Sequence, residues 1–209
     1  MKSEVDFKVN QIINSNLKSN TYIIYNEQND LSVIIDPGDI NSKSLINFLL
    51  KKKIKNYNVI LTHEHYDHIS GLKPLCSLFD INLYLSISCF QNLNNPKKNL
   101  TEYLDVENLD SLSPKNFHIV HDNEIKLIDD YFFKFFYTPG HSEGSMCIGL
   151  NNVIFTGDTL IENQKTITNL PGGNKYIYEE TKKKLNDFLI NYEIVYPGHG
   201  CVIQNKLLK

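Results

Sequence analysis

Thr62-His63-Glu64-His65-Tyr66-Asp67-His68 decides how this sequence is interpreted, because it gathers four potential metal ligands within six residues. The stretch directly follows a short apolar run that predicts a β-strand. Side chains two positions apart in an extended segment point the same way, so His63 and His65 can share one metal ion. Asp67 and His68 fall in the turn that follows, near a predicted helix start, and point to a different place. The stretch therefore predicts ligands for two adjacent ions.

Three further ligand-type residues each follow a predicted strand and stand beside a glycine. They are His141 in Pro139-Gly140-His141, Asp158 in Gly157-Asp158-Thr159 and His199 in Pro197-Gly198-His199. Glycine lets the backbone turn sharply and approach an ion closely, because it lacks a side chain. A single Pro-Gly-His or Gly-Asp is more often an ordinary turn. Together with the first motif, which holds three of the seven histidines, they predict one shared metal centre.

The remaining histidines and the four cysteines carry no comparable pattern. His118 and His121 lie in a predicted strand and at its exit, and we expect ordinary surface or hydrogen-bonded histidines there. The cysteines are widely spaced, without a C-x-x-C pair, which argues against a thiolate zinc site or a disulfide framework. Cys147 lies in an apolar run, so we expect a buried, reduced thiol. A reducing, cytoplasmic setting is the resulting expectation.

The composition is typical of a globular protein. Apolar residues make up 41% and charged residues 22%, with 11 Phe and 12 Tyr, which is too apolar for a disordered chain. The net charge of −3 gives no electrostatic reason to expect nucleic acid or an anionic membrane as a partner. All 21 lysine-or-arginine residues are lysine, so no arginine is available to bind an anionic group through bidentate hydrogen bonds. We expect a small-molecule substrate as the partner, and neither nucleic acid nor a membrane.

The predicted elements fall into two successive halves, and in each half strands are followed by helix. The predicted strands are Phe7–Ile13, Thr21–Tyr25, Leu31–Ile35, Asn58–Leu61, Phe117–Val120, Ile125–Ile128, Tyr131–Tyr137, Ser145–Leu150, Val153–Phe155 and Ile194–Tyr196. The predicted helices are Ser42–Lys53, Ile69–Phe79 and Glu179–Ile190. Asp36-Pro37-Gly38 is a turn signal, and the Asn-rich stretch Ser88–Pro114 predicts an extended loop region with a little helix. This order favours two sheets packed face to face with helices outside.

The chain length and its ends fit one domain. The 209 residues allow a single substantial core, and we expect residues 1–209 to form one domain. The N-terminal stretch Met1–Asp6 carries an early acidic pair and no long apolar segment. We therefore expect neither a signal peptide nor a membrane span. The sequence does not predict an oligomeric state.

The four motifs, in this order, resemble those of the metallo-β-lactamase superfamily from Asn20 to about Val202. The resemblance implies an α/β fold, the αββα four-layer sandwich of two mixed β-sheets flanked by helices, with the metals at one edge of the sheets. It also implies three histidines on a first metal, an aspartate and two histidines on a second, and one bridging aspartate. These ligands are His63, His65 and His141 for the first metal, Asp67, His68 and His199 for the second, and Asp158 for the bridge.

Within the superfamily the chain is similar to the short glyoxalase II-like (hydroxyacylglutathione hydrolase-like) enzymes. The matching segments are Thr138–Ser145, Gly157–Leu160, Leu170–Gly173 and, loosely, Asn95–Thr101. Asp158 stands where true β-lactamases often have cysteine or histidine, which argues against antibiotic hydrolysis. There are two departures from the glyoxalase II pattern. The helical C-terminal domain that helps to hold glutathione is not expected, and Ile167 replaces the arginine of Gly-Arg-Thr-Asp.

The resemblance implies a dinuclear metal-dependent hydrolase that attacks a thioester or related ester with a metal-bridging hydroxide. Two zinc ions are expected, although iron and manganese suit the same nitrogen and oxygen ligands. We expect Asp67 to orient the hydroxide and to pass its proton to the leaving group, the alternative being a plain ligand. Glu64 and Tyr66 alternate away from the ligand face, and we expect them behind the ligands or at the surface. Substrate-binding residues are not predicted.

Three other functions remain open from the sequence. A mononuclear-iron persulfide dioxygenase would need only the three ligands of one metal. A phosphodiesterase or nuclease of the same fold would want a basic exosite or an extra domain, and neither is visible in the sequence. A non-catalytic metal-binding module would not need all seven ligands to be intact. Lys165 and Lys175 are candidate anion partners near the late loop, or else ordinary solvated charges.

Overall fold

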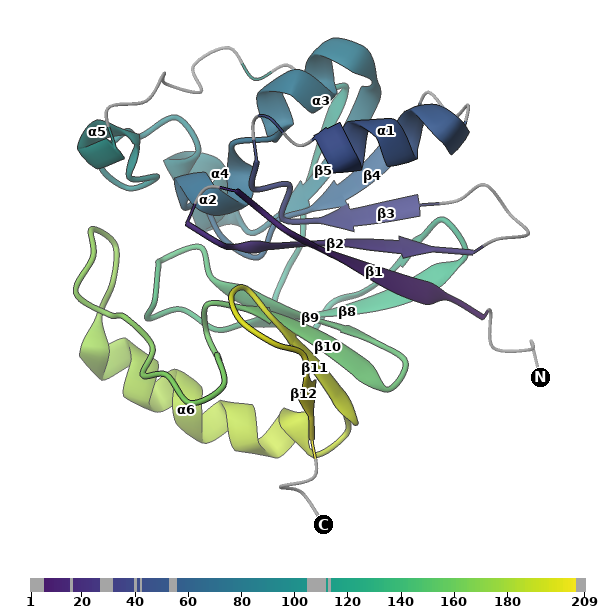
Figure 1. Ribbon diagram of the computed structural model, residues 1–209. Coiled ribbons are helices and arrows are strands. Elements are labelled where there is room, and N and C mark those ends of the chain that lie inside the picture. Colours follow the sequence, from purple (N-terminus) through teal and green to yellow (C-terminus); the bar gives the residue numbers. More distant parts are fainter. Residues whose placement is uncertain are drawn as a thin grey trace.

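Two six-stranded β-sheets pack face to face at the centre of the structure, a computed structural model (Figure 1). The structure describes residues 6–15, 17–26, 32–39, 41, 43–52, 56–104, 112 and 114–205. Several expectations therefore lie outside the described residues. They are those for Met1–Val5, for Leu31, for Ser42 and Lys53 at the ends of the first helix, and for most of 105–113.

The first sheet contains the N-terminal strands in sequence order. They are β1 (Lys8–Ile13), β2 (Asn20–Tyr25), β3 (Ser32–Ile35), β4 (Asn56–Ile60), β5 (Asp80–Leu85) and β6 (Asn116–Ile119). The first three strands are antiparallel, and β3 to β6 run parallel, so the sheet is mixed. The helices α1 (Lys43–Lys52) and α3 (Leu72–Leu78) cover its outer face (Figure 1).

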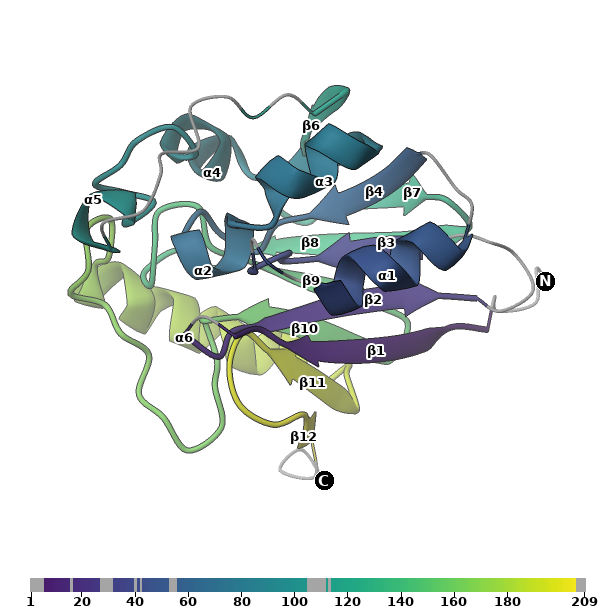
Figure 2. The same cartoon turned by 45° about the horizontal axis from the view of Figure 1, so that its top comes forward.

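The second sheet contains the C-terminal strands in the order β12-β11-β10-β9-β8-β7. They are β7 (Ile125–Ile128), β8 (Tyr131–Tyr137), β9 (Met146–Leu150), β10 (Val153–Gly157), β11 (Ile194–Pro197) and β12 (Ile203–Gln204). Only β10 and β11 pair in parallel, so this sheet is mixed as well. The long helix α6 (Lys175–Leu189) covers its outer face (Figures 1 and 2).

Three layers of apolar side chains hold the four structural layers together. The central one lies between the sheets and includes the fully buried Phe133, Phe135 and Phe155. The second joins the first sheet to its helices, and the third joins the second sheet to α6, where Phe136 stacks on Phe188 at 4.2 Å. Burial of such faces is the main favourable term in folding. The predicted αββα sandwich of two mixed sheets is confirmed. No helix in the described part of the chain is long and apolar enough to cross a membrane.

The structure corrects several predicted elements. Strand β5 was not predicted, although Ile81, Leu83 and Leu85 alternate with a period of two, which is typical of a strand. Strand β12 was also missed. The predicted loop region contains two short helices, α4 (Ile87–Asn92) and α5 (Thr101–Leu104). Helix α6 begins four residues before the predicted start, because the Asn174 side chain accepts hydrogen bonds from the first backbone N–H groups.

The helix predicted over Ile69–Phe79 is broken in two, and the break serves the site. A short helix α2 (Tyr66–Ile69) precedes α3, with Ser70 and Gly71 between them. Gly71 donates its N–H to the carbonyl of Pro37 at 2.7 Å, and a Cβ at Gly71 would lie 2.6 Å from that oxygen. The turn after β3 thus presses directly against the break. This contact fixes α2, and with it the second half of the His63–His68 motif.

Candidate metal centre

All seven predicted ligands lie together at one end of the sandwich, in loops that follow four different strands. His63 and His65 follow β4, and His141 follows β8. Asp158 follows β10, and His199 follows β11. Asp67 and His68 lie in α2, directly after the first pair. No predicted ligand lies apart from the others, while the role of each as a ligand stays a prediction.

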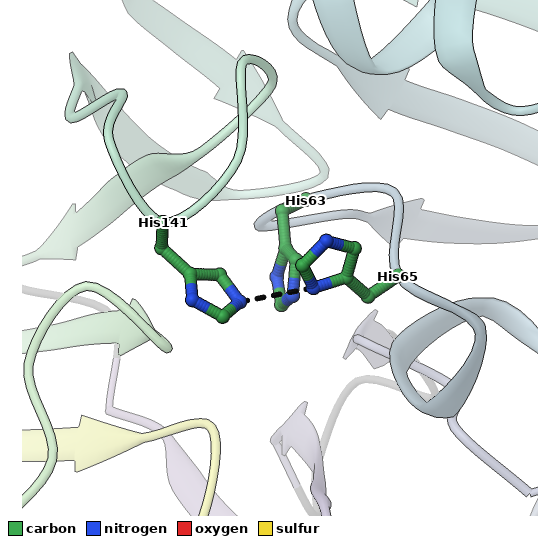
Figure 3. Close-up of side chains that lie close together, drawn as sticks. All are labelled: His63, His65 and His141. Atoms are coloured by element: carbon green, nitrogen blue, oxygen red, sulfur yellow. Dashed lines mark hydrogen bonds between the residues drawn. The ribbon is translucent and has the colours of Figure 1, made fainter. Parts of the chain in front are cut away.

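The first group consists of His63, His65 and His141, whose rings converge from two loops (Figure 3). Each offers one ring nitrogen, and these nitrogens lie within 4.8 Å of one another. Nε2 of His141 is 2.9 Å from Nδ1 of His65. Two facing ring nitrogens at this distance need a shared proton or a cation between them. The group therefore has the form of a three-nitrogen metal site.

The second group consists of Asp67, His68 and His199, and Asp158 joins it to the first. Oδ2 of Asp67 lies 3.1 Å from Nε2 of His199 and 3.6 Å from Nε2 of His68. One oxygen of Asp158 lies 3.4 Å from His68 Nε2. The other lies 3.4 Å from His199 Nε2 and 3.6 Å from His141 Nε2. The carboxylate of Asp158 thus lies between both groups, where the family resemblance implies a bridging ligand.

Hydrogen bonds at Nδ1 orient three of the histidine rings. Nδ1 of His68 donates to Oδ2 of Asp36 at 3.0 Å, and Nδ1 of His141 donates to the carbonyl of Ile167 at 2.8 Å, because both partners only accept. Nδ1 of His63 lies 3.0 Å from Oγ1 of Thr62, whose own proton goes to Asp36. The Nε2 of each ring is therefore the nitrogen that faces the centre of the cluster and that a metal would take. Such partners fix the tautomer of metal-binding histidines.

Three of the atoms that face the centre have no hydrogen-bond partner among the described residues: Nε2 of His63, Nε2 of His68 and Oδ1 of Asp158, all of them buried. Buried polar atoms are rarely left unpaired, since each costs free energy. A divalent cation would satisfy the inward-facing atoms, and neutral imidazole and carboxylate are the ligands that zinc, iron and manganese accept. The residues present therefore fit a metal.

The electrostatics of the two groups differ. Burial and the neighbouring histidines lower the pKa of His63 well below its usual value, and burial lowers the pKa of His65 to about 3. Burial alone would also lower the pKa of His68, but Asp67 and Asp158 outweigh it and raise this pKa well above its usual value. The pKa of His199 is raised in the same way, against the effect of burial. The first group is therefore neutral at pH 7, whereas the second holds protons that a metal would have to displace.

Metal affinity is consequently expected to rise with pH as long as the pH lies below the raised pKa values of His68 and His199, because protons must then leave both rings when a metal binds. Competition with a chromophoric chelator at pH 6.5 and pH 8 measures the affinity. Calorimetry in buffers of different ionisation enthalpy measures the released protons. An affinity that does not change with pH, with no proton release, would contradict this electrostatic assignment.

Sequence reasoning missed the role of Asp36, which it treated as part of a turn. Oδ1 of Asp36 accepts the backbone N–H of Thr62 at 2.7 Å, and Oδ2 accepts from Thr62 Oγ1 and from His68. A carboxylate oxygen of Asp36 and ring nitrogens of His63 and His68 lie within 4.8 Å of one another, close enough to hold one metal ion together. Its oxygens already serve these donors, so we assign it to orienting ligands. Its φ of 51° lies in the left-handed region, where aspartate is one of the tolerated residues.

Other expectations for single residues have mixed outcomes. Glu64 turns away from the ligands as predicted, towards Asn92 and Ser142. Glu64 and Tyr66 are both buried, so the surface alternative is wrong. His118 lies outside the cluster and stacks on Tyr84 at 4.5 Å. Cys147 is buried as expected. The lysines at 165 and 175 are exposed, so the structure offers no reason to place them in the site.

Comparison with known proteins agrees with this geometry. The family model of the metallo-beta-lactamase superfamily matches residues 15–199. A protein named probable metallo-hydrolase, from Streptococcus pyogenes serotype M6, is 30% identical over 207 residues, covering 92% of this chain and 84% of its own. A hydroxyacylglutathione hydrolase of Pelagibacter ubique is 26% identical over 203 residues, covering 93% and 72% respectively.

A solved structure gives the same result for the fold. The BLEG-1 B3 metallo-beta-lactamase superposes with a TM-score of 0.79 at 26% identity, covering 97% of this chain and 100% of that one. The family match spans most of the chain, including every predicted ligand. The superfamily binds divalent metals, and the clustered histidines and aspartates are consistent with that property. This chain belongs to the metallo-β-lactamase superfamily of metallo-hydrolases.

Proposed function

We propose that this protein is a dinuclear metal-dependent hydrolase of a small-molecule thioester or related ester, of the hydroxyacylglutathione hydrolase kind. The observation that carries the proposal is the position of Asp158, whose two oxygens face His68 on one side and His141 and His199 on the other. A mononuclear-iron centre would use only the first three histidines. The convergence of a second group on the same carboxylate favours two metals.

The proposed ligand sets follow the two groups. His63, His65 and His141 hold the first metal, Asp67, His68 and His199 hold the second, and Asp158 serves both. We propose zinc for both, since nitrogen and oxygen ligands suit it. When bound, such a pair supplies Lewis-acid polarisation of the substrate oxygen and lowers the pKa of water towards neutrality. The protein supplies the orientation of the rings through Asp36, Thr62 and the Ile167 carbonyl.

Asp67 is the proposed proton carrier. Burial alone would raise its pKa, but His68 and His199 lower it below its ordinary value, so Asp67 is a carboxylate at neutral pH. Its backbone is held in place, because Ser19 donates its hydroxyl proton to the Asp67 carbonyl. From this position the Asp67 oxygen that does not face the metal would accept a hydrogen bond from the attacking water and pass the proton to the thiolate that leaves.

The substrate side of the site is less basic than in typical glyoxalase II-like relatives. The Ile167 carbonyl holds His141, while the Ile167 side chain is 54% exposed. This position therefore presents an apolar side chain where the family resemblance leads one to expect arginine. We propose that the thioester is the recognised group and that glutathione is not required.

The experiment that tests the proposed function is a substrate panel with metal-depleted and zinc-reconstituted protein. S-Lactoylglutathione is compared with a short acyl thioester of cysteamine, with bis(p-nitrophenyl) phosphate and with a β-lactam. We expect zinc-dependent cleavage of the thioesters, and little difference between the two thioesters. Zinc-dependent cleavage of the phosphodiester alone would replace the proposal with a phosphodiesterase, and cleavage of none would refute it.

A further inference from the structure

We propose that Glu64 and Asn92 form a positioning pair that sets the spacing between the two loops carrying the histidines of the first metal. Glu64 lies between His63 and His65 in the first loop, and Asn92 is the last residue of α4. Neither residue points at the metal centre, and neither is among the predicted ligands. The inference rests on the proposed function only in that it needs a metal to be bound, and not on the identity of the substrate.

The carboxylate of Glu64 is fully buried and accepts hydrogen bonds on both oxygens. Oε1 accepts from the amide of Asn92 at 3.1 Å. Oε2 accepts from the hydroxyl of Ser142 at 3.0 Å, and the backbone N–H of Gly144 is a further donor to the carboxylate. Burying a carboxylate is expensive unless hydrogen bonds compensate, and here they come from two other segments of the chain.

These donors join three segments at one point. Ser142 and Gly144 belong to the loop that directly follows His141, so Glu64 ties this loop to the His63–His65 loop. A Cβ at Gly144 would lie 2.3 Å from Oε2 of Glu64, which shows how closely the two loops approach. Hydrogen bonds to one buried carboxylate therefore hold the two loops together beyond the backbone bond from the Met146 N–H to the Thr62 carbonyl at 2.9 Å.

Helix α4 fixes the position of this junction from a third side. Its capping residue Ser86 donates its hydroxyl proton to the carbonyl of Gly144 at 2.8 Å. The backbone of Cys89 lies against Gly144, since a Cβ there would be 2.7 Å from the nitrogen of Cys89. Asn92, one turn further along α4, reaches Glu64. The helix thus contacts the His141 loop through its start and the His63–His65 loop through its end.

The neighbouring Glu143 provides a matched control. It accepts from the same Asn92 amide at 3.2 Å and pairs with Lys98 at 2.7 Å, but its side chain is 50% exposed. A carboxylate in that setting contributes little, because water and salt screen it. Glu64 and Glu143 therefore differ mainly in burial and in whether they join the two loops.

The test uses full-length protein loaded with Co(II), whose absorption spectrum reports the geometry of the ligands. Glu64→Gln is expected to weaken the tighter Co(II) site by about 10–100-fold and to change its visible spectrum, as loss of a partner that orients metal ligands does. Without metal, the Glu64→Gln variant and the wild-type protein should have nearly the same unfolding temperature. Glu143→Gln should bind Co(II) with wild-type affinity and spectrum.

Two further variants keep the test decisive if Glu64→Gln fails to fold. Asn92→Ala should weaken Co(II) binding in the same direction but by less, because Ser142 and Gly144 still hold Glu64. The Asn92 amide also donates to Glu143, so in the triple variant Glu64→Gln/Asn92→Asp/Glu143→Gln donor and acceptor are exchanged across both contacts, and affinity and spectrum should recover in part. Wild-type Co(II) affinity and spectrum in Glu64→Gln or in Asn92→Ala would overturn the positioning role of the pair, but not the proposed metal centre. Absence of Co(II) binding by the wild-type protein would overturn the metal centre as well.

Discussion

Asp158→Ala is expected to lower kcat/KM for the thioester by about 10³-fold. The variant loses charge stabilisation supplied by the metals, which raises the free energy of the transition state by several kcal/mol. The carboxylate of Asp158 lies 3.4 Å from both His68 and His199 and 3.6 Å from His141. In the proposed ligand sets, its loss would remove a ligand from each metal at once. Steady-state kinetics, together with elemental analysis of the purified variant, measures both effects.

Glu162→Gln is the control for this prediction, because Glu162 is exposed and lies only four residues further along the same loop. Its kcat/KM and metal content should stay within about twofold of the wild type, as for most exposed substitutions. An Asp158→Ala variant that still binds two metals and turns over at the wild-type rate would show that Asp158 bridges nothing.

Asp36→Asn is expected to weaken the second metal site by about 10–100-fold while changing the unfolding temperature only slightly. Asparagine has nearly the same shape, tolerates the left-handed backbone at this position, and still accepts the Thr62 N–H. Its amide, however, offers a proton to His68 Nδ1 in place of an acceptor. The His68 proton then moves to Nε2, which blocks the nitrogen that faces the metal.

Asp36→Ala separates the two roles of this residue. It leaves the Thr62 N–H and His68 Nδ1 buried without an acceptor, and loss of one partner of a buried ion pair costs about 3–5 kcal/mol. Chemical denaturation and chelator competition should thus show a large stability loss for Asp36→Ala, but a selective affinity loss for Asp36→Asn. Equal metal affinity in Asp36→Asn and the wild type would contradict the assigned tautomer of His68.

The seven candidate ligands were predictable because their signals are local. His63 and His65 alternate after a strand, and Asp67 and His68 follow them directly. His141, Asp158 and His199 stand beside glycines that follow strands. A Cβ at Gly198 would lie 2.1 Å from an oxygen of Asp158 and 2.9 Å from the His68 ring, so the glycine is needed for close approach. The sandwich was predictable from the order of strands and helices, which reflects which faces must be buried.

The residues behind the ligands were not predictable, because their contacts depend on how strands pair. Asp36 reaches His68 across 32 positions of sequence. This contact exists because β3 and β4 run parallel with Ile35 opposite Ile60, so the residues that follow the two strands lie side by side. For Glu64 the alternation gave the correct direction, but its burial depends on α4, which the sequence did not place. Local pattern therefore identifies ligands better than it identifies their supports.

The most direct test of the dinuclear centre is the metal content of the protein purified without added metal. Elemental analysis of the wild type and of His141→Ala and His199→Ala, one substitution in each group, counts the ions and locates them. The proposed ligand sets predict about two zinc ions per chain in the wild type and a loss of about one in each variant. A wild-type protein with a single iron ion, or with no metal, would contradict the proposed dinuclear centre.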